Sequence, residues 1–183
     1  MVAVFKSGIV WLLLLVSLMN TPTVYLETSF INRLADPLKR EPRLRQQQLS
    51  SREWWNTFRR RYTLVSSPFT FNECCLDHPN QRIVRLRLRY FANLTIFRPP
   101  AKDLARLARA LRQLRGPLPA EEVVDSQHIA TAAIAGCWYL LTWNQKHIAN
   151  PFTQKIVDNI IESHGFQAPT VATPEQFLEA ALD

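Results

Sequence analysis

Two polar side chains in this sequence follow closely on runs of β-forming residues. Glu27 comes immediately after the run at 23–26, and Asn144 comes two residues after the apolar run at 138–142. In parallel sheets, ligands bind beyond the carboxyl ends of the strands. If both runs are strands of one such sheet, Glu27 and Asn144 lie on the same rim and are placed for chemistry.

Two acids on predicted helices could reach the same rim. Asp125 lies in the stretch 121–130, which begins with acids and then turns apolar. Burying an unpaired carboxylate is costly, so Asp125 needs a cation or hydrogen bonds. Glu73 lies on the helix predicted after the second strand. A loose cluster of such oxygen ligands suits Mg²⁺ or Mn²⁺, and solvated surface acids are the simpler alternative.

Strands and helices alternate along the chain. Short β-forming runs predict strands, and apolar residues at helical spacing between Pro, Gly and capping residues predict helices. The predicted strands are 23–26, 62–65, 94–97, 138–142 and 170–172, and the predicted helices are 30–34, 68–73, 83–91, 101–114, 119–135 and 150–163, with two more beginning at 50 and 174. This alternation predicts an α/β fold with a mostly parallel sheet.

Two segments allow more than one interpretation. Residues 36–48 are polar and contain two prolines, so we expect an exposed loop that leads into the helix at Ser50, where Glu53 completes a capping box. Residues 83–91 fit helical spacing but also alternate like a strand. We predict a helix there, because 94–97 is the better strand.

The composition is that of one folded domain that could bind a polyanion. The chain has 183 residues, of which 47% are apolar and 20% are charged. Lys and Arg number 22 against 15 acids, a net charge of +7, and most of the basic residues are Arg. This favours nucleic acid or an acidic protein as partner, with a solvated basic surface as the alternative.

Several reactive side chains have simpler structural interpretations. The three cysteines have no zinc-site spacing and two are adjacent, so we expect reduced, buried thiols in a cytoplasmic protein. His128 is expected to pack in the core, with metal ligation as the alternative. Trp54 and Trp55 are expected in the core or an interface. Thr28 or Ser29 is expected to cap a helix, because no Ser–His–acid arrangement stands out.

The N-terminal segment stands apart from the predicted domain. Residues 9–19 are almost entirely apolar, which is short for a membrane span but has the length of a signal-peptide core. An uncleaved anchor, an extra apolar helix, and sequence upstream of the true start are the three interpretations. We favour the last, because Met19 stands just before the first strand. The predicted division is a leader at 1–18 and a domain at 19–183.

Four segments carry a resemblance to a known family. The most specific is Leu-Leu-Thr-Trp-Asn-Gln-Lys-His-Ile-Ala-Asn at 140–150, and the weaker ones lie at 23–29, 125–130 and 169–175. In order and spacing they resemble PIN-domain proteins of the VapC-like toxin family, over about residues 20 to 179. The resemblance implies a three-layer α/β/α domain.

The resemblance also implies a site and an activity. Its four acidic positions fall on Glu27, Glu73, Asp125 and Asn144, where Asn144 replaces the Asp of many relatives. The first three would be metal ligands for Mg²⁺ or Mn²⁺, with Glu73 acting directly, through water or as a general base. The weakly implied RNA contacts, Thr142, Lys146 and His147, flank Asn144. For His147, anchoring the loop through hydrogen bonds is the alternative to phosphate contact.

The implied function is that of a metal-dependent endoribonuclease toxin. Its expected partners are RNA, a separate antitoxin protein that blocks the acidic site, and a second copy in a homodimer. Two alternatives differ in class. One is a catalytically inactive PIN-like module that binds RNA or protein, and the other is an exported or membrane-tethered basic protein that uses residues 1–18.

Overall fold

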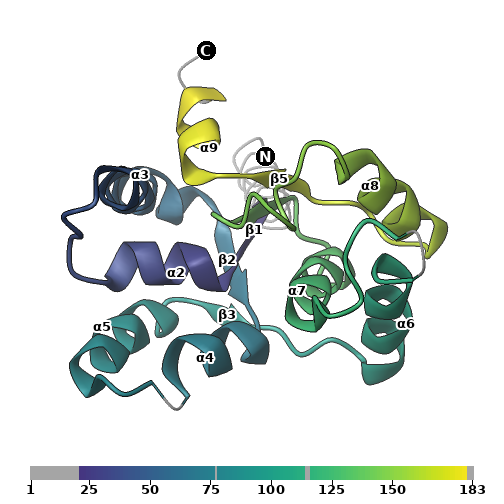
Figure 1. Cartoon of the computed structure of the whole chain (residues 1–183), viewed down its shortest axis with the longest axis horizontal. Coiled ribbons are helices and arrows are strands. Elements are labelled where there is room, and N and C mark those ends of the chain that lie inside the picture. Colours follow the sequence, from purple (N-terminus) through teal and green to yellow (C-terminus); the bar gives the residue numbers. More distant parts are fainter. Residues whose placement is uncertain (1–20, 77, 114–115, 181–183) are drawn as a thin grey trace, which may run out of the picture.

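Five parallel strands form the centre of the structure, a computed structural model that describes residues 21–76, 78–113 and 116–180 (Figure 1). The strands are β1 (Thr23–Leu26), β2 (Thr63–Ser66), β3 (Thr95–Ile96), β4 (Tyr139–Leu141) and β5 (Thr170–Ala172). The helices are α2 (Thr28–Ala35), α3 (Pro42–Phe58), the 3₁₀ turn η1 (Arg59–Arg61), α4 (Pro68–Cys75), α5 (Gln81–Phe91), α6 (Ala101–Leu111), α7 (Val123–Ile134), α8 (Gln154–Ser163) and α9 (Pro174–Ala180). The α/β fold and its parallel sheet are thereby confirmed.

The order of the strands places a crevice beside β1. The sheet runs β3-β2-β1-β4-β5, and Val24 of β1 pairs with Leu64 of β2 on one side and Tyr139 of β4 on the other. The chain adds β2 and β3 outward on one side and then returns to add β4 and β5 on the other. Such a reversal opens a crevice beyond the carboxyl ends of the two strands that flank it, here β1 and β4.

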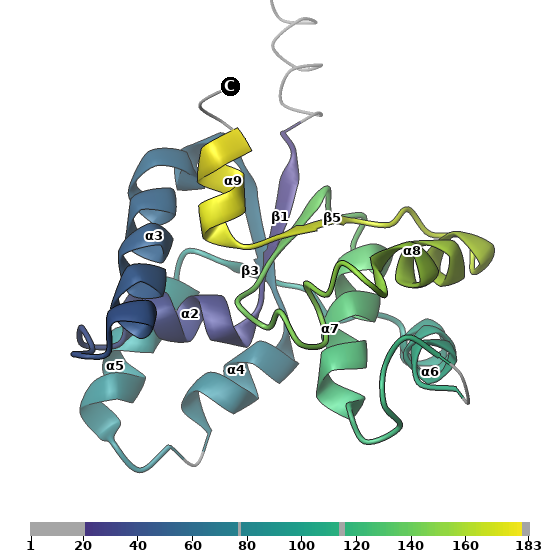
Figure 2. The same ribbon diagram turned by 45° about the horizontal axis from the view of Figure 1, so that its top comes forward.

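Helices cover both faces of the sheet. One core packs side chains of α2, α3, α4, α5 and α9 against the sheet, and a second core packs those of α6, α7 and α8 against the other face. Figure 2 shows these two groups of helices separated by the strands. Trp54 is fully buried in the first core, edge-on to Phe30 and Phe177, and Trp55 is buried beside it. Their predicted place in the core is confirmed.

The segment expected to be a loop is largely helix. α3 begins at Pro42 rather than at Ser50, because the Glu41 carboxylate accepts hydrogen bonds from the backbone N–H groups of Arg43 and Leu44 and so caps the helix start. Ser50 is buried in the middle of α3, and the expected capping box does not form. The Arg and Gln residues that made this stretch look exposed are also good helix formers.

Other helix boundaries differ by a few residues from those predicted. α7 begins at Val123 instead of 119, α8 begins at Gln154 instead of 150, and α6 ends at Leu111. The segment 83–91 is helical as predicted, and its Arg87 turns inward to form a buried, two-bonded ion pair with Asp36 at 2.9 Å.

The three cysteines are free and buried, as expected. Burial raises the pKa of all three thiols, that of Cys137 to about 12. Within the described residues, no helix is long and apolar enough to cross a membrane. The predicted leader at 1–18 lies outside these residues.

Candidate functional site

Glu27 occupies the junction between β1 and α2. Its backbone N–H donates to the carbonyl of Leu141 in β4, which fixes Glu27 at the carboxyl ends of β1 and β4. Its side chain accepts from the backbone N–H of Ser29, so Glu27 itself caps α2. The expectation that Thr28 or Ser29 provides this cap is wrong, because the acid one residue earlier has the extended backbone that a capping residue needs.

The two carboxylate oxygens of Glu27 have different surroundings. Oε2 accepts three hydrogen bonds, from the Ser29 N–H at 2.9 Å, from the Ser29 hydroxyl, and from the Thr142 hydroxyl at 2.8 Å. Oε1 forms none with the described part of the chain, although the residue is only 4% exposed and lines an open hollow of about 490 Å³. A nearly buried carboxylate with one oxygen held and the other free could accept a cation at the free oxygen.

Glu73 reaches the same hollow from α4. Its Oε2 accepts from the Thr28 hydroxyl and lies 2.8 Å from Nε2 of His128. Burial would raise the pKa of Glu73, but hydrogen bonds from His128 and Thr28, together with the nearby imidazole charge, outweigh it and lower the pKa below its ordinary value. Glu73 is therefore ionised at neutral pH.

His128 is fully buried in α7, as predicted, but it is more than a packing residue. Nδ1 lies 2.8 Å from the hydroxyl of Tyr25 in β1, and Nε2 meets Glu73. One ligand atom each from Glu27, Glu73 and His128 lies within 4.8 Å of the other two. The spacing of three residues places His128 on the same helix face as Asp125, but it gave no signal for the contacts with Tyr25 and Glu73.

Asp125 stands at the start of α7, and one of its oxygens is already in use. Oδ2 accepts from the Asn144 amide at 2.8 Å and lies 2.9 Å from Nδ1 of His147. Glu122 lies 3.3 Å from the same imidazole nitrogen, and these two acids with His147 form a second close group. Asn144 also accepts from the His147 N–H, so both ends of its amide are bonded within the protein.

The four predicted site residues all line the one hollow, in two subgroups. Glu27 and Glu73 belong to the first close group, whereas Asp125 and Asn144 belong around His147. The expected ligand set of Glu27, Glu73 and Asp125 therefore does not form one tight cluster within the described residues. Mg²⁺ commonly binds one or two carboxylates and keeps several waters, so the donor set fits a hydrated divalent cation.

The predicted RNA contacts have different surroundings. Lys146 is exposed in the loop after β4. Thr142 is fully buried, and its hydroxyl donates to Glu27 and accepts from the Asn144 N–H. Its side chain therefore positions Glu27 and the loop after β4 and is not a surface contact. His147 is held by Asp125, so it anchors the loop, the alternative to phosphate contact.

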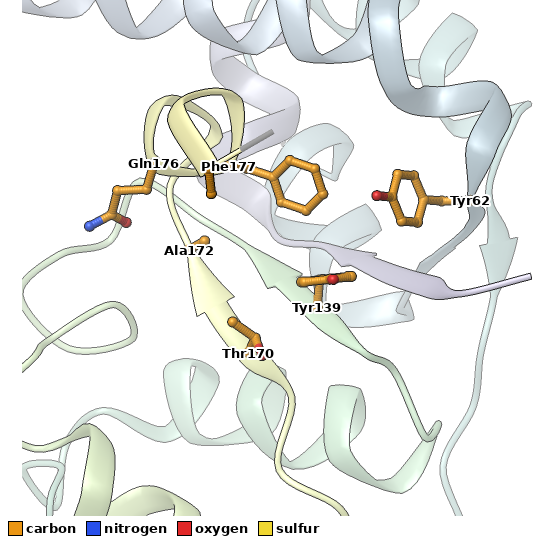
Figure 3. Close-up of a pocket in the computed structure, with 7 residues that line it drawn as sticks. Tyr62, Tyr139, Thr170, Ala172, Gln176 and Phe177 are labelled. Carbon is orange, nitrogen blue, oxygen red and sulfur yellow. The ribbon is translucent and has the colours of Figure 1, made fainter. Parts of the chain in front are cut away.

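Sequence reasoning missed several residues of the hollow, among them Arg33 and Arg43. A separate hollow of about 270 Å³ between α9 and the ends of β4 and β5 is lined by Tyr62, Tyr139, Thr170, Ala172, Gln176, Phe177 and Ala180 (Figure 3). Among the described residues, no acid or imidazole lines this hollow, so they offer none of the metal chemistry of the first.

No family model and no curated protein matches this chain. The class of protein that the fold defines is an α/β protein with a five-stranded, all-parallel sheet and helices on both faces.

Proposed function

We propose that the protein is a PIN-like, metal-dependent endoribonuclease, similar to VapC-type toxins, that hydrolyses RNA phosphodiester bonds. The observation that carries this proposal is Glu27, a buried carboxylate with one saturated and one free oxygen, in a hollow shared with Glu73 and Asp125. The hollow lies at the strand-order reversal, where α/β sheets bind their ligands. The net charge of +7 suits a polyanionic substrate.

Each residue of the site has its own role in the proposed hydrolysis. When bound, Mg²⁺ would polarise the scissile phosphate and make a water acidic enough to attack it. Glu27 and Asp125 would hold the hydrated ion from the two subgroups of the hollow, since each keeps one carboxylate oxygen that forms no hydrogen bond with the described residues. Glu73 would accept the proton of the attacking water or help to hold the ion through water. Asn144 would position Asp125, because its amide is already bonded to that carboxylate.

The biological setting follows from the same proposal. A toxin of this kind would act in the cytoplasm, pair as a homodimer, and be held inactive by an antitoxin protein that covers the acidic hollow. The second candidate is an inactive PIN-like module that binds RNA or protein. It is favoured by one observation, that His147 and Asn144 already occupy Oδ2 of Asp125.

The test compares the wild type with Asp125→Asn and with Asp103→Asn, a partly exposed acid of α6 that pairs with Arg106 and does not line the hollow. Each purified protein is incubated with mixed RNA in Mg²⁺ or EDTA, and its folding is checked by circular dichroism. We expect cleavage by the wild type and by Asp103→Asn in Mg²⁺ only, and at least a ~100-fold loss in Asp125→Asn. Cleavage that survives EDTA and Asp125→Asn would refute the proposal, and no cleavage by folded wild type would favour the inactive module.

A further inference from the structure

The acidic hollow has a basic wall. Arg33, in the last turn of α2, and Arg43, in the first turn of α3, line the same hollow as Glu27, Glu73 and Asp125. Arg33 is partly buried and Arg43 is exposed. Negative charge on the floor and positive charge on one wall is the arrangement that suits a cation together with the phosphate it neutralises.

Both guanidinium groups are held by neutral amides. Arg33 donates from Nε to Oε1 of Gln47 at 2.8 Å, and Arg43 donates from one terminal nitrogen to Oε1 of Gln145 at 3.4 Å. Gln145 is the residue after Asn144, so Arg43 joins α3 to the loop that carries the site. An amide orients a guanidinium without cancelling its charge, and it leaves most of the N–H donors available.

Arg87 shows the opposite case, an arginine whose charge is neutralised by a carboxylate. Arg87 is buried and its charge is matched by Asp36 through two bonds, which makes it a structural residue. Neither Arg33 nor Arg43 forms an ion pair with a carboxylate in the described parts of the chain. Their charges are therefore available for an anion, although acids line the hollow beside them.

We infer that Arg33 and Arg43 bind the phosphate backbone of an RNA strand and seat it over the acidic floor. This inference rests on the proposed function and names the groups that would position its substrate. A polyanion that approaches three carboxylates meets electrostatic repulsion, and the two guanidinium groups that line the same hollow offset this repulsion. Arg suits the task because its planar fork binds phosphate through two parallel hydrogen bonds.

The test measures RNA binding apart from cleavage. Arg33→Gln, Arg43→Gln and the double variant are compared with Arg45→Gln, an exposed arginine of α3 that does not line the hollow. Full-length proteins bind a fluorescent single-stranded RNA 12-mer in EDTA, and anisotropy gives Kd over a series of salt concentrations. We expect the double variant to bind roughly 10- to 100-fold more weakly and to lose about 0.7 from the salt slope for each phosphate contact removed. Arg45→Gln should change Kd by less than about 2-fold.

A second measurement separates this inference from the proposed function. The rise in melting temperature on adding Mn²⁺ reports the acidic floor, and the double variant should keep it. If wild type binds RNA and the double variant binds it as tightly as Arg45→Gln does, the inference is overturned while the nuclease proposal stands. If wild type gains stability from Mn²⁺ but binds no RNA, both the inference and the assignment of RNA as substrate are overturned.

Discussion

Thr142→Val tests the hydrogen bond that the buried Thr142 hydroxyl donates to the carboxylate of Glu27. The Thr142 hydroxyl donates to Oε2 of Glu27 at 2.8 Å and accepts from the backbone N–H of Asn144 at 2.9 Å. Valine has nearly the same shape but can make neither bond. The substitution therefore leaves a nearly buried carboxylate with two donors, both from Ser29, in place of three.

The size of the effect follows from the kind of bond that is lost. A hydrogen bond to a charged group contributes about 1.5–3 kcal/mol, and the bond from Asn144 adds about 1 kcal/mol. We expect a loss of about 3 kcal/mol in the free energy of unfolding. In a protein of this size that corresponds to a melting temperature lower by roughly 6–12 °C.

Thr131→Val is the matched control. Thr131 is also fully buried, but its hydroxyl has no hydrogen-bond partner among the residues that the structure describes. Replacing it removes an unsatisfied polar group, so stability should stay the same or rise by up to about 1–2 kcal/mol. Both variants are unfolded in urea with EDTA present. Equal effects of the two substitutions, or a loss under about 1 kcal/mol for Thr142→Val, would refute the hydrogen-bond arrangement around Glu27.

Three further outcomes follow from buried or coupled groups. Arg87→Met should lower the unfolding free energy by about 3–5 kcal/mol in urea, because Asp36 keeps a buried charge without its partner; wild-type stability in this variant would contradict it. Glu73 is only partly buried, and its desolvation is outweighed by hydrogen bonds from His128 and Thr28, which lower its pKa. Its contribution to the free energy of unfolding is therefore complete above about pH 4.5 and is lost as the pH falls through the lowered pKa. Glu73→Gln should then lose less melting temperature than wild type between pH 5 and pH 3. Burial raises the pKa of Cys74 and Cys137, so a thiol reagent at pH 8 should label them quickly only after denaturation.

Much of the sheet was predictable because β1, β4 and β5 are short runs of β-forming residues that are each followed by a polar residue. Residues 23–26 form a continuous run of β-forming residues, and Val24, Tyr25 and Leu26 are buried on the two faces of the sheet, which is typical of a central parallel strand. The positions of Glu27 and Asn144 follow from those strand ends alone. Their placement beside one hollow needed only the rule that parallel strands present their carboxyl ends at one edge.

The internal partners of the site could not be predicted in the same way. The contacts of His128 with Tyr25 and Glu73 join residues up to 103 positions apart, and no local spacing encodes such a meeting. The basic wall was missed for a different reason. Residues 36–48 were expected to be loop, which left Arg43 without a fixed direction, whereas a helix that starts at Pro42 points it into the hollow.

The support of Glu27 links the geometry of the site to the pairing of the sheet. The Ser29 hydroxyl donates to Glu27 and accepts from the backbone N–H of Trp143 at 2.7 Å, while Thr142 bonds the same carboxylate oxygen. These bonds form only when β1 and β4 pair with Leu26 opposite Leu141. A shift of one residue would turn each side chain of β4 to the other face and move Thr142 away from Glu27. The free oxygen of Glu27 is thus directed by the register of two central strands, which makes the acid a rigid feature of the fold and able to hold a cation without rearrangement.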